Sequence, residues 1–141
     1  MILLDTSGLL AAIDASQRHH ERAAAALRDT REPLLLSPFV LAELDYLLAT
    51  RVGSHAALAL LAEVARGAYR LESFDAADVA SALEVIETHR DLDVGIADAS
   101  IVVLSHRHST CDVLTLDERH FRVLRGAGGR PFRLLPADWT G

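Results

Sequence analysis

Short apolar runs alternate along the chain with longer stretches of helical spacing. Three apolar residues in a row stand at 2–4 and again at 34–36, and further strand-like segments lie at 69–71, 111–116 and 132–135. Uninterrupted apolar runs of this length are typical of parallel strands that are buried on both faces of a sheet. Apolar residues spaced three and four positions apart predict a short helical turn at 8–15 and helices over 17–29, 38–52, 54–66, 75–89 and 96–106.

This alternation predicts an α/β fold, a three-layer α/β/α domain with a largely parallel central sheet. We expect the first strand to lie at the centre of that sheet. The length of 141 residues suits one domain, and no internal repeat or low-complexity segment interrupts it. We therefore treat residues 1–141 as a single PIN-sized α/β domain.

Two helix starts carry clear capping signals. Ser37 and Pro38 place a serine at the N-cap and a proline in the first helical position. Asp93 is expected to cap the helix that begins at Ile96. The two helices between 38 and 66, which are joined by Gly-Ser, predict an αα-hairpin.

The charge balance argues against a protein that holds nucleic acid by bulk electrostatics, because the formal net charge is -6. All 14 basic residues are arginines, so mechanisms that need a catalytic or phosphate-binding lysine are excluded. Five of the arginines crowd into the last quarter of the chain, at Arg119, Arg122, Arg125, Arg130 and Arg133.

Other features of the composition predict a cytoplasmic protein. The single cysteine, Cys111, cannot form an intrachain disulfide, which suits a reducing compartment. Met1 leads directly into a predicted strand rather than into the basic segment of a signal peptide. No apolar run approaches the ~20 residues of a membrane span, so we expect no membrane association.

Two acids come directly after predicted strands. Asp5 follows the first strand and Asp117 follows the fourth, so both are expected at the carboxyl edge of the sheet. In open α/β sheets that edge is where ligands bind. The alternative for each acid is that it only caps the helix or turn that follows.

Two further acids lie early in helices, on or beside apolar faces. Glu43 projects at the edge of an apolar face, and Asp98 lies in the first turn of a helix rich in isoleucine, valine and alanine. A carboxylate pushed toward the core must be paired or must bind a cation. For Glu43 the alternative is a position at the helix rim that reaches solvent.

All four acids can converge at one edge of the sheet. Two unit charges about 4 Å apart repel by about 4 kcal/mol at an effective dielectric of 20, so either some carboxyls stay protonated or divalent cations compensate. An all-oxygen site with no histidine or cysteine at fixed spacing selects Mg²⁺ or Mn²⁺. Such a site performs metal-assisted phosphodiester chemistry.

The segments that carry these acids resemble the acidic motifs of PIN-domain ribonucleases, and the bacterial VapC toxins of type II toxin–antitoxin systems are the most similar group. The segments are Leu-Leu-Asp-Thr-Ser at 3–7, Ser-Pro-Phe-Val-Leu-Ala-Glu-Leu at 37–44, Gly-Ile-Ala-Asp-Ala-Ser at 95–100 and Leu-Thr-Leu-Asp-Glu-Arg-His-Phe at 114–121. The resemblance covers essentially the whole chain, and four motifs at this spacing are specific.

The resemblance implies an endoribonuclease that uses Mg²⁺, with Mn²⁺ as a substitute, to cleave structured cellular RNA such as tRNA or rRNA. It implies that the four acids hold the metal and carry catalysis, with Thr6 and Thr115 supporting them: Asp5, Glu43, Asp98 and Asp117. It also implies a homodimer that forms a heterotetramer or a larger complex with a VapB-type antitoxin.

Two expectations concern the partners of such an enzyme. An exposed apolar groove on the αα-hairpin would receive a short antitoxin helix. The C-terminal arginines would contact RNA phosphate, which would reconcile an acidic chain with an anionic substrate.

Two other readings of the acids were weighed against this one. A receiver domain or a haloacid-dehalogenase-type phosphatase also has an aspartate after its first strand, but both use a lysine and this chain has none. The second alternative is a catalytically inactive PIN-like module that only binds protein or RNA. Intact acids at all four positions argue against it, because an inactive module has no need of their mutual repulsion.

Overall fold

A five-stranded sheet, with every strand pair parallel, forms the centre of the computed structural model, which describes residues 1–140. The strand order is β3-β2-β1-β4-β5. The strands are β1 Ile2–Leu4, β2 Leu34–Leu36, β3 Arg70–Leu71, β4 Asp112–Leu114 and β5 Arg133–Leu135. The predicted α/β class, the parallel sheet and the central place of the first strand are all confirmed.

Burial explains why β1 takes the central place. Its three residues are buried, and Leu3 pairs with Leu35 of β2 on one side and with Val113 of β4 on the other. A strand covered on both faces and both edges contains no polar side chain, as the apolar run at 2–4 indicated.

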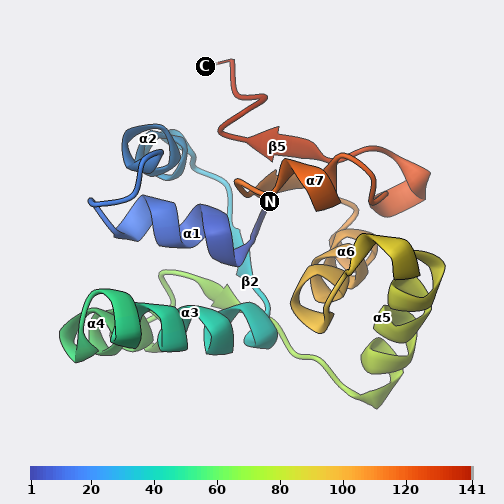
Figure 1. The fold of residues 1–141 in the computed structure, drawn as a ribbon, viewed down its shortest axis with the longest axis horizontal. Helices are drawn as coiled ribbons and strands as arrows, with labels where there is room; N and C mark the ends of the chain where they lie inside the picture. The colour runs from blue at the N-terminus through green and yellow to red at the C-terminus, as the bar shows by residue number, and fades with distance from the viewer. Residues whose placement is uncertain (141) are drawn as a thin grey trace.

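Seven α-helices surround the sheet in the described part of the chain, and they pack in neighbouring pairs: α1 with α2, α3 with α4, and α5 with α6 (Figure 1). Their bounds are α1 Thr6–Ile13, α2 His20–Asp29, α3 Pro38–Arg51, α4 Ser54–Ala65, α5 Ala76–Thr88, α6 Ile96–His108 and α7 Glu118–Phe121. Short 3₁₀ helices span Arg90–Leu92 and Ala127–Gly129. No helix among residues 1–140 has the length and apolar content needed to cross a bilayer.

The start of α3 follows its capping signal. The Ser37 hydroxyl accepts a hydrogen bond from the Phe39 N–H at 3.2 Å, with Pro38 in the first helical position. The same hydroxyl lies 2.7 Å from the hydroxyl of Ser100 in α6, and both side chains are buried. This contact ties the first turn of α3 to the first turns of α6, so it fixes the helices that carry Glu43 and Asp98.

Gly8 allows α1 to approach the end of β4. A Cβ atom at this position would overlap the Leu114 carbonyl and would lie 2.7 Å from the Thr115 nitrogen. Because only glycine lacks that atom, the first turn of α1 can lie directly against the strand end that leads to Thr115. Residues 5–7 and 115–117 are brought together in this way.

Several local expectations were wrong. Asp5, not Thr6 or Ser7, occupies the N-cap position of α1, and no side chain caps that helix. Asp93 adopts a left-handed conformation with φ of 57°, and Gly95 is the N-cap of α6. Helix α6 also continues to His108, beyond its expected end at residue 106. These errors arise because the tertiary contacts of a polar side chain decide whether it is free to cap a helix.

Candidate functional site

A pocket of about 330 Å³ opens where the central strands end, and all four predicted acids line it. Its full lining is Asp5, Thr6, Ser7, Leu10, Gln17, Glu43, Leu47, Arg51, Asp98, Leu116 and Asp117. A larger hollow of about 510 Å³ lies between α5 and α6, but Glu84 is the one carboxylate among its lining residues. Because the chemistry-bearing side chains gather at the smaller pocket, we place the candidate site there.

Asp5 is held at the floor of this pocket by two hydroxyl groups. It is only 4% exposed. Its Oδ2 accepts a hydrogen bond from the Thr115 hydroxyl at 2.6 Å and another from the Ser7 hydroxyl at 3.0 Å. Burial, reinforced by the nearby charge of Asp98, raises the pKa of Asp5 to about 6, although both hydrogen bonds act to lower it. Asp5 therefore does not cap α1; its carboxyl group belongs to the pocket.

Glu43 reaches the pocket from the exposed side of α3. The Thr6 hydroxyl donates a hydrogen bond to Glu43 Oε1 at 2.7 Å, which links α1 to α3. The glutamate itself is exposed, so it lies at the rim and reaches solvent, as the alternative reading proposed. Its place in the pocket lining shows that a rim position and a place in the site are compatible.

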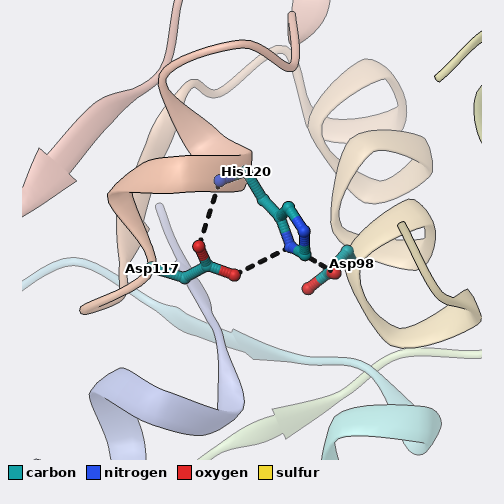
Figure 2. A group of neighbouring side chains, drawn as sticks. All are labelled: Asp98, Asp117 and His120. Atoms are coloured by element: carbon teal, nitrogen blue, oxygen red, sulfur yellow. Dashed lines mark hydrogen bonds and ion pairs between the residues drawn. The ribbon is translucent and has the colours of Figure 1, made fainter. Parts of the chain in front are cut away.

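Asp98 and Asp117 face each other across the ring of His120 (Figure 2). His120 Nδ1 lies 2.8 Å from Asp117 Oδ2 and 3.0 Å from Asp98 Oδ2. The opposite ring nitrogen, Nε2, lies 2.7 Å from the Leu92 carbonyl oxygen. Burial raises the pKa of Asp98, and the charges of Asp117 and Glu43 act in the same direction, while His120 opposes them.

Asp117 caps a helix and lines the site at the same time. Its Oδ1 accepts the His120 N–H at 3.0 Å, which makes it the N-cap of α7. Its own N–H donates to the Thr115 hydroxyl at 2.9 Å. Thr115 thus connects Asp5 to Asp117, and the cap and site readings of Asp117 both hold.

The negative charge of the pocket has no arginine partner. Among residues 1–140, none of the four acids forms an ion pair with an arginine. By contrast, the buried Glu72 outside this pocket lies 3.3 Å from Arg70 and 3.4 Å from Arg107. Converging carboxylates without a protein cation form a donor set that fits a divalent metal ion.

Sequence reasoning missed three side chains of this region. His120 was read as part of a turn, yet it lies in α7, three residues after Asp117, and so returns to the same side. Ser7 was read as a helix cap, yet its hydroxyl also accepts the Leu116 N–H at 3.0 Å. Arg51 lies in the pocket lining at the end of α3, and no motif pointed to it.

The C-terminal arginines lie elsewhere. None of them lines the acidic pocket. Arg122 is paired with Asp138 at 2.7 Å and with Glu118 at 2.9 Å, and Arg133 is paired with Asp112 at 2.9 Å. These contacts compete with any phosphate contact that we expected from the cluster.

Comparison with known proteins agrees with this geometry. The chain is 44% identical over 135 residues to Ribonuclease VapC26 of Mycobacterium tuberculosis, a match that covers 96% of this chain and all of the relative. It is similar to the crystal structure of the sarcin-ricin-loop-cleaving toxin VapC20 of Mycobacterium tuberculosis, with a TM-score of 0.78, 25% identity, and 83% and 90% of the two chains covered.

Two further solved structures share the fold. VapBC2 of Rickettsia felis, solved bound to a DNA fragment from its promoter, has a TM-score of 0.64 and 19% identity over 95% of this chain and 98% of the other. FitAcB of Neisseria gonorrhoeae has a TM-score of 0.52 and 24% identity over 77% and 83%. The sequence model of the PIN domain matches residues 2–126. With that match and a VapC relative 44% identical over nearly its whole length, this chain belongs to the PIN-domain family as a VapC-type member.

Proposed function

We propose that this protein is a metal-dependent endoribonuclease and the toxin of a VapBC-type toxin–antitoxin pair, with Mg²⁺ or Mn²⁺ as its ion. One observation carries the proposal: four carboxylates line one pocket, and among residues 1–140 no arginine pairs with them. The names of the relatives, a ribonuclease and an RNA-loop-cleaving toxin, support RNA as the substrate.

The residues divide the work of such a site between holding and orienting. Asp5 and Asp98 are our first choices for holding the ion, with Glu43 and Asp117 beside them. The hydroxyls of Thr115 and Thr6 orient the carboxyl groups of Asp5 and Glu43. A bound divalent ion would activate water and stabilise the leaving oxygen of the cleaved phosphodiester bond.

The substrate in this proposal is structured cellular RNA such as tRNA or rRNA. The pocket must admit a polyanion although its floor is acidic, so positive charge is needed at the rim. Arg51 lies in the lining and makes no ion pair or side-chain hydrogen bond among residues 1–140, so its guanidinium remains available for a phosphate. Arg51 therefore takes the role that we expected from the C-terminal arginines.

The partner in this proposal is a VapB-type antitoxin on a toxin homodimer, assembled as a heterotetramer or a larger complex. The αα-hairpin of α3 and α4 exposes apolar side chains to which an antitoxin helix can bind, with Tyr46 67% and Leu58 65% exposed. A neighbouring reading frame that encodes a DNA-binding N-terminus and a flexible C-terminus would support this. A single domain over residues 1–141 and a cytoplasmic location complete the proposal.

Metal removal tests the enzymatic part. The purified full chain, freed of antitoxin, should cut RNA with Mg²⁺ or Mn²⁺ and should stop when EDTA is added. Asp5→Asn should abolish both the cutting and the growth arrest caused by expression of the chain. Cleavage that continues in EDTA would reject the metal-dependent mechanism. Failure of the full chain to bind either ion would favour an inactive PIN-like binding module.

A further inference from the structure

The imidazole of His120 presents one ring nitrogen to two carboxylates of the acidic site. Nδ1 lies within 3.0 Å of one oxygen of Asp98 and one of Asp117 (Figure 2). This nitrogen is buried, yet neither oxygen lies where a ring N–H at Nδ1 would point, so Nδ1 has no hydrogen-bond partner among residues 1–140. The three side chains come from α6, from the residue before α7 and from α7 itself.

The other ring nitrogen fixes the tautomer. Nε2 lies 2.7 Å from the carbonyl oxygen of Leu92, which can only accept a hydrogen bond. Nε2 therefore carries the proton, and in the neutral ring Nδ1 presents a lone pair. A lone pair that faces two carboxylate oxygens is repelled unless a cation lies among the three atoms. Histidines that bind metals typically donate their second N–H to a backbone carbonyl in this way.

The spacing of the three atoms also fits a shared ion. Among the described residues, Asp98, Asp117 and His120 form the one group whose three ligand atoms all lie within 4.8 Å of one another. Neighbouring ligands of an octahedral ion with bonds of about 2.1 Å are about 3 Å apart. The distances of 2.8 Å and 3.0 Å from Nδ1 to the two oxygens agree with that spacing.

A doubly protonated ring is the competing explanation of this cluster. Such a ring would be an imidazolium ion paired with two carboxylates. Its Nδ1–H would then point at one oxygen in the plane of the ring, but neither oxygen occupies that direction. The geometry therefore favours a bare Nδ1.

We propose that His120 Nδ1 is a direct ligand of the divalent ion, together with Asp98 and Asp117, and that this nitrogen makes the site prefer Mn²⁺ to Mg²⁺. Mg²⁺ binds oxygen ligands almost exclusively, whereas imidazole nitrogen suits first-row transition metals. The inference rests on the proposed metal-dependent function and names its cofactor. It replaces the all-oxygen site that the sequence suggested with a mixed nitrogen and oxygen site.

Electron spin-echo spectroscopy of bound Mn²⁺ tests this without any activity measurement. The purified full chain, freed of antitoxin, receives one equivalent of Mn²⁺, and the ¹⁴N modulation from a directly bound nitrogen is recorded. Wild type should show the modulation and His120→Gln should lose it. His106→Gln is the matched control, because His106 is an exposed histidine on α6 outside the acidic pocket, and it should keep the modulation.

Ion affinity gives a second readout. By calorimetry, His120→Gln should bind Mn²⁺ roughly tenfold or more weakly than wild type, while its affinity for Mg²⁺ should change less. Should that variant fail to fold, wild type grown with ¹⁵N-histidine decides the matter, because a ligating histidine replaces the ¹⁴N pattern with that of ¹⁵N.

Each outcome separates the two proposals. Mn²⁺ that binds with no nitrogen modulation, in a protein that still cuts RNA, would overturn the role of His120 and leave the ribonuclease proposal intact. Equal affinity of wild type for Mg²⁺ and Mn²⁺ would overturn the preference. Absence of any binding of either ion would overturn both proposals.

Discussion

The hydroxyl of Thr115 donates a hydrogen bond of 2.6 Å to Asp5 Oδ2, and so joins the ends of the two neighbouring strands β4 and β1. The same hydroxyl accepts the N–H of Asp117. Thr115 is 1% exposed, so water cannot replace either contact. One buried threonine therefore sets the position of two of the four acids and lowers the pKa of Asp5.

Thr115→Val tests this role. Loss of the hydroxyl leaves Asp5 without its shortest hydrogen bond, so the pKa of Asp5 should rise further above its value of about 6. If cleavage needs ionised Asp5, the acidic limb of the pH–rate profile should move to higher pH. The free energy of unfolding should fall by about 1–3 kcal/mol, because a buried donor and acceptor lose their partner.

Ser7→Ala is the matched control for that substitution. Ser7 also donates to Asp5 Oδ2, but at 3.0 Å and with a smaller effect on the pKa. Its removal should shift the acidic limb in the same direction by less. An acidic limb that stays in place in Thr115→Val would show that ionisation of Asp5 does not control the reaction.

Asp5 should make the metal-free protein less stable at neutral pH. Its pKa is raised from 3.8 to about 6 in the folded state, so its stabilising contribution is complete below pH 3.8 and is lost as pH rises through about 6. Asp5→Asn removes this penalty. In the absence of metal it should be more stable than wild type at pH 7.5, by an upper limit of about 3 kcal/mol.

Thermal unfolding at two pH values checks the sign. The advantage of Asp5→Asn should be largest at pH 7.5 and nearly gone below about pH 4, where wild-type Asp5 is protonated in both states. Addition of Mn²⁺ should raise the Tm of wild type more than that of the variant, since a ligand that binds only the folded state stabilises it. A variant less stable than wild type at pH 7.5 without metal would show that Asp5 is not strained there.

Gly8→Ala should disturb the fold next to the site. The added Cβ would overlap the backbone at the end of β4, so we expect a loss of about 1–3 kcal/mol in the free energy of unfolding, measured with urea. Gly95→Ala serves as the control, because nothing lies within 4 Å of a Cβ there. As an N-cap residue it should cost less than about 1 kcal/mol. Equal effects of the two variants would contradict the close approach of α1 and β4.

Arg51→Ala should weaken RNA binding. Because Arg51 lies at the rim of the pocket without an ion-pair partner among residues 1–140, its loss should raise KM for RNA and reduce the salt dependence of KM, while kcat stays close to wild type. Arg122→Ala is the control, since Arg122 is paired with Asp138 and Glu118. If Arg122→Ala raised KM more than Arg51→Ala, the C-terminal arginines would be the phosphate contacts after all.

The sequence predicted the fold well because its strongest signals are local. The apolar runs at 2–4 and 34–36 can be buried only in a covered parallel sheet, and an acid that directly follows such a strand must lie at its carboxyl end. Asp5 and Asp117 were therefore located by the strands before them. Glu43 was located only as a helix position, and its reach to the pocket depends on Thr6 from another helix.

The features that sequence reasoning missed are those that tertiary contacts decide. His120 lies in the four-residue helix α7, too short to give a periodic pattern, and its ring direction is set by the Leu92 carbonyl from a distant 3₁₀ helix. Arg51 reaches the pocket from the last residue of α3, a position that no spacing rule marks. Ser7 has the composition of a helix cap, but its hydroxyl is occupied by Asp5 and Leu116.

Single-turnover cleavage of a structured RNA tests the central claim most directly. Wild type, Asp98→Asn and Asp45→Asn are compared with Mn²⁺ or Mg²⁺ present, where Asp45 is an acid of α3 that does not line the pocket. We predict that Asp98→Asn loses at least about a hundredfold in rate, because it removes a charge that holds the ion, while Asp45→Asn keeps the wild-type rate. Cleavage by Asp98→Asn at the wild-type rate would contradict the account.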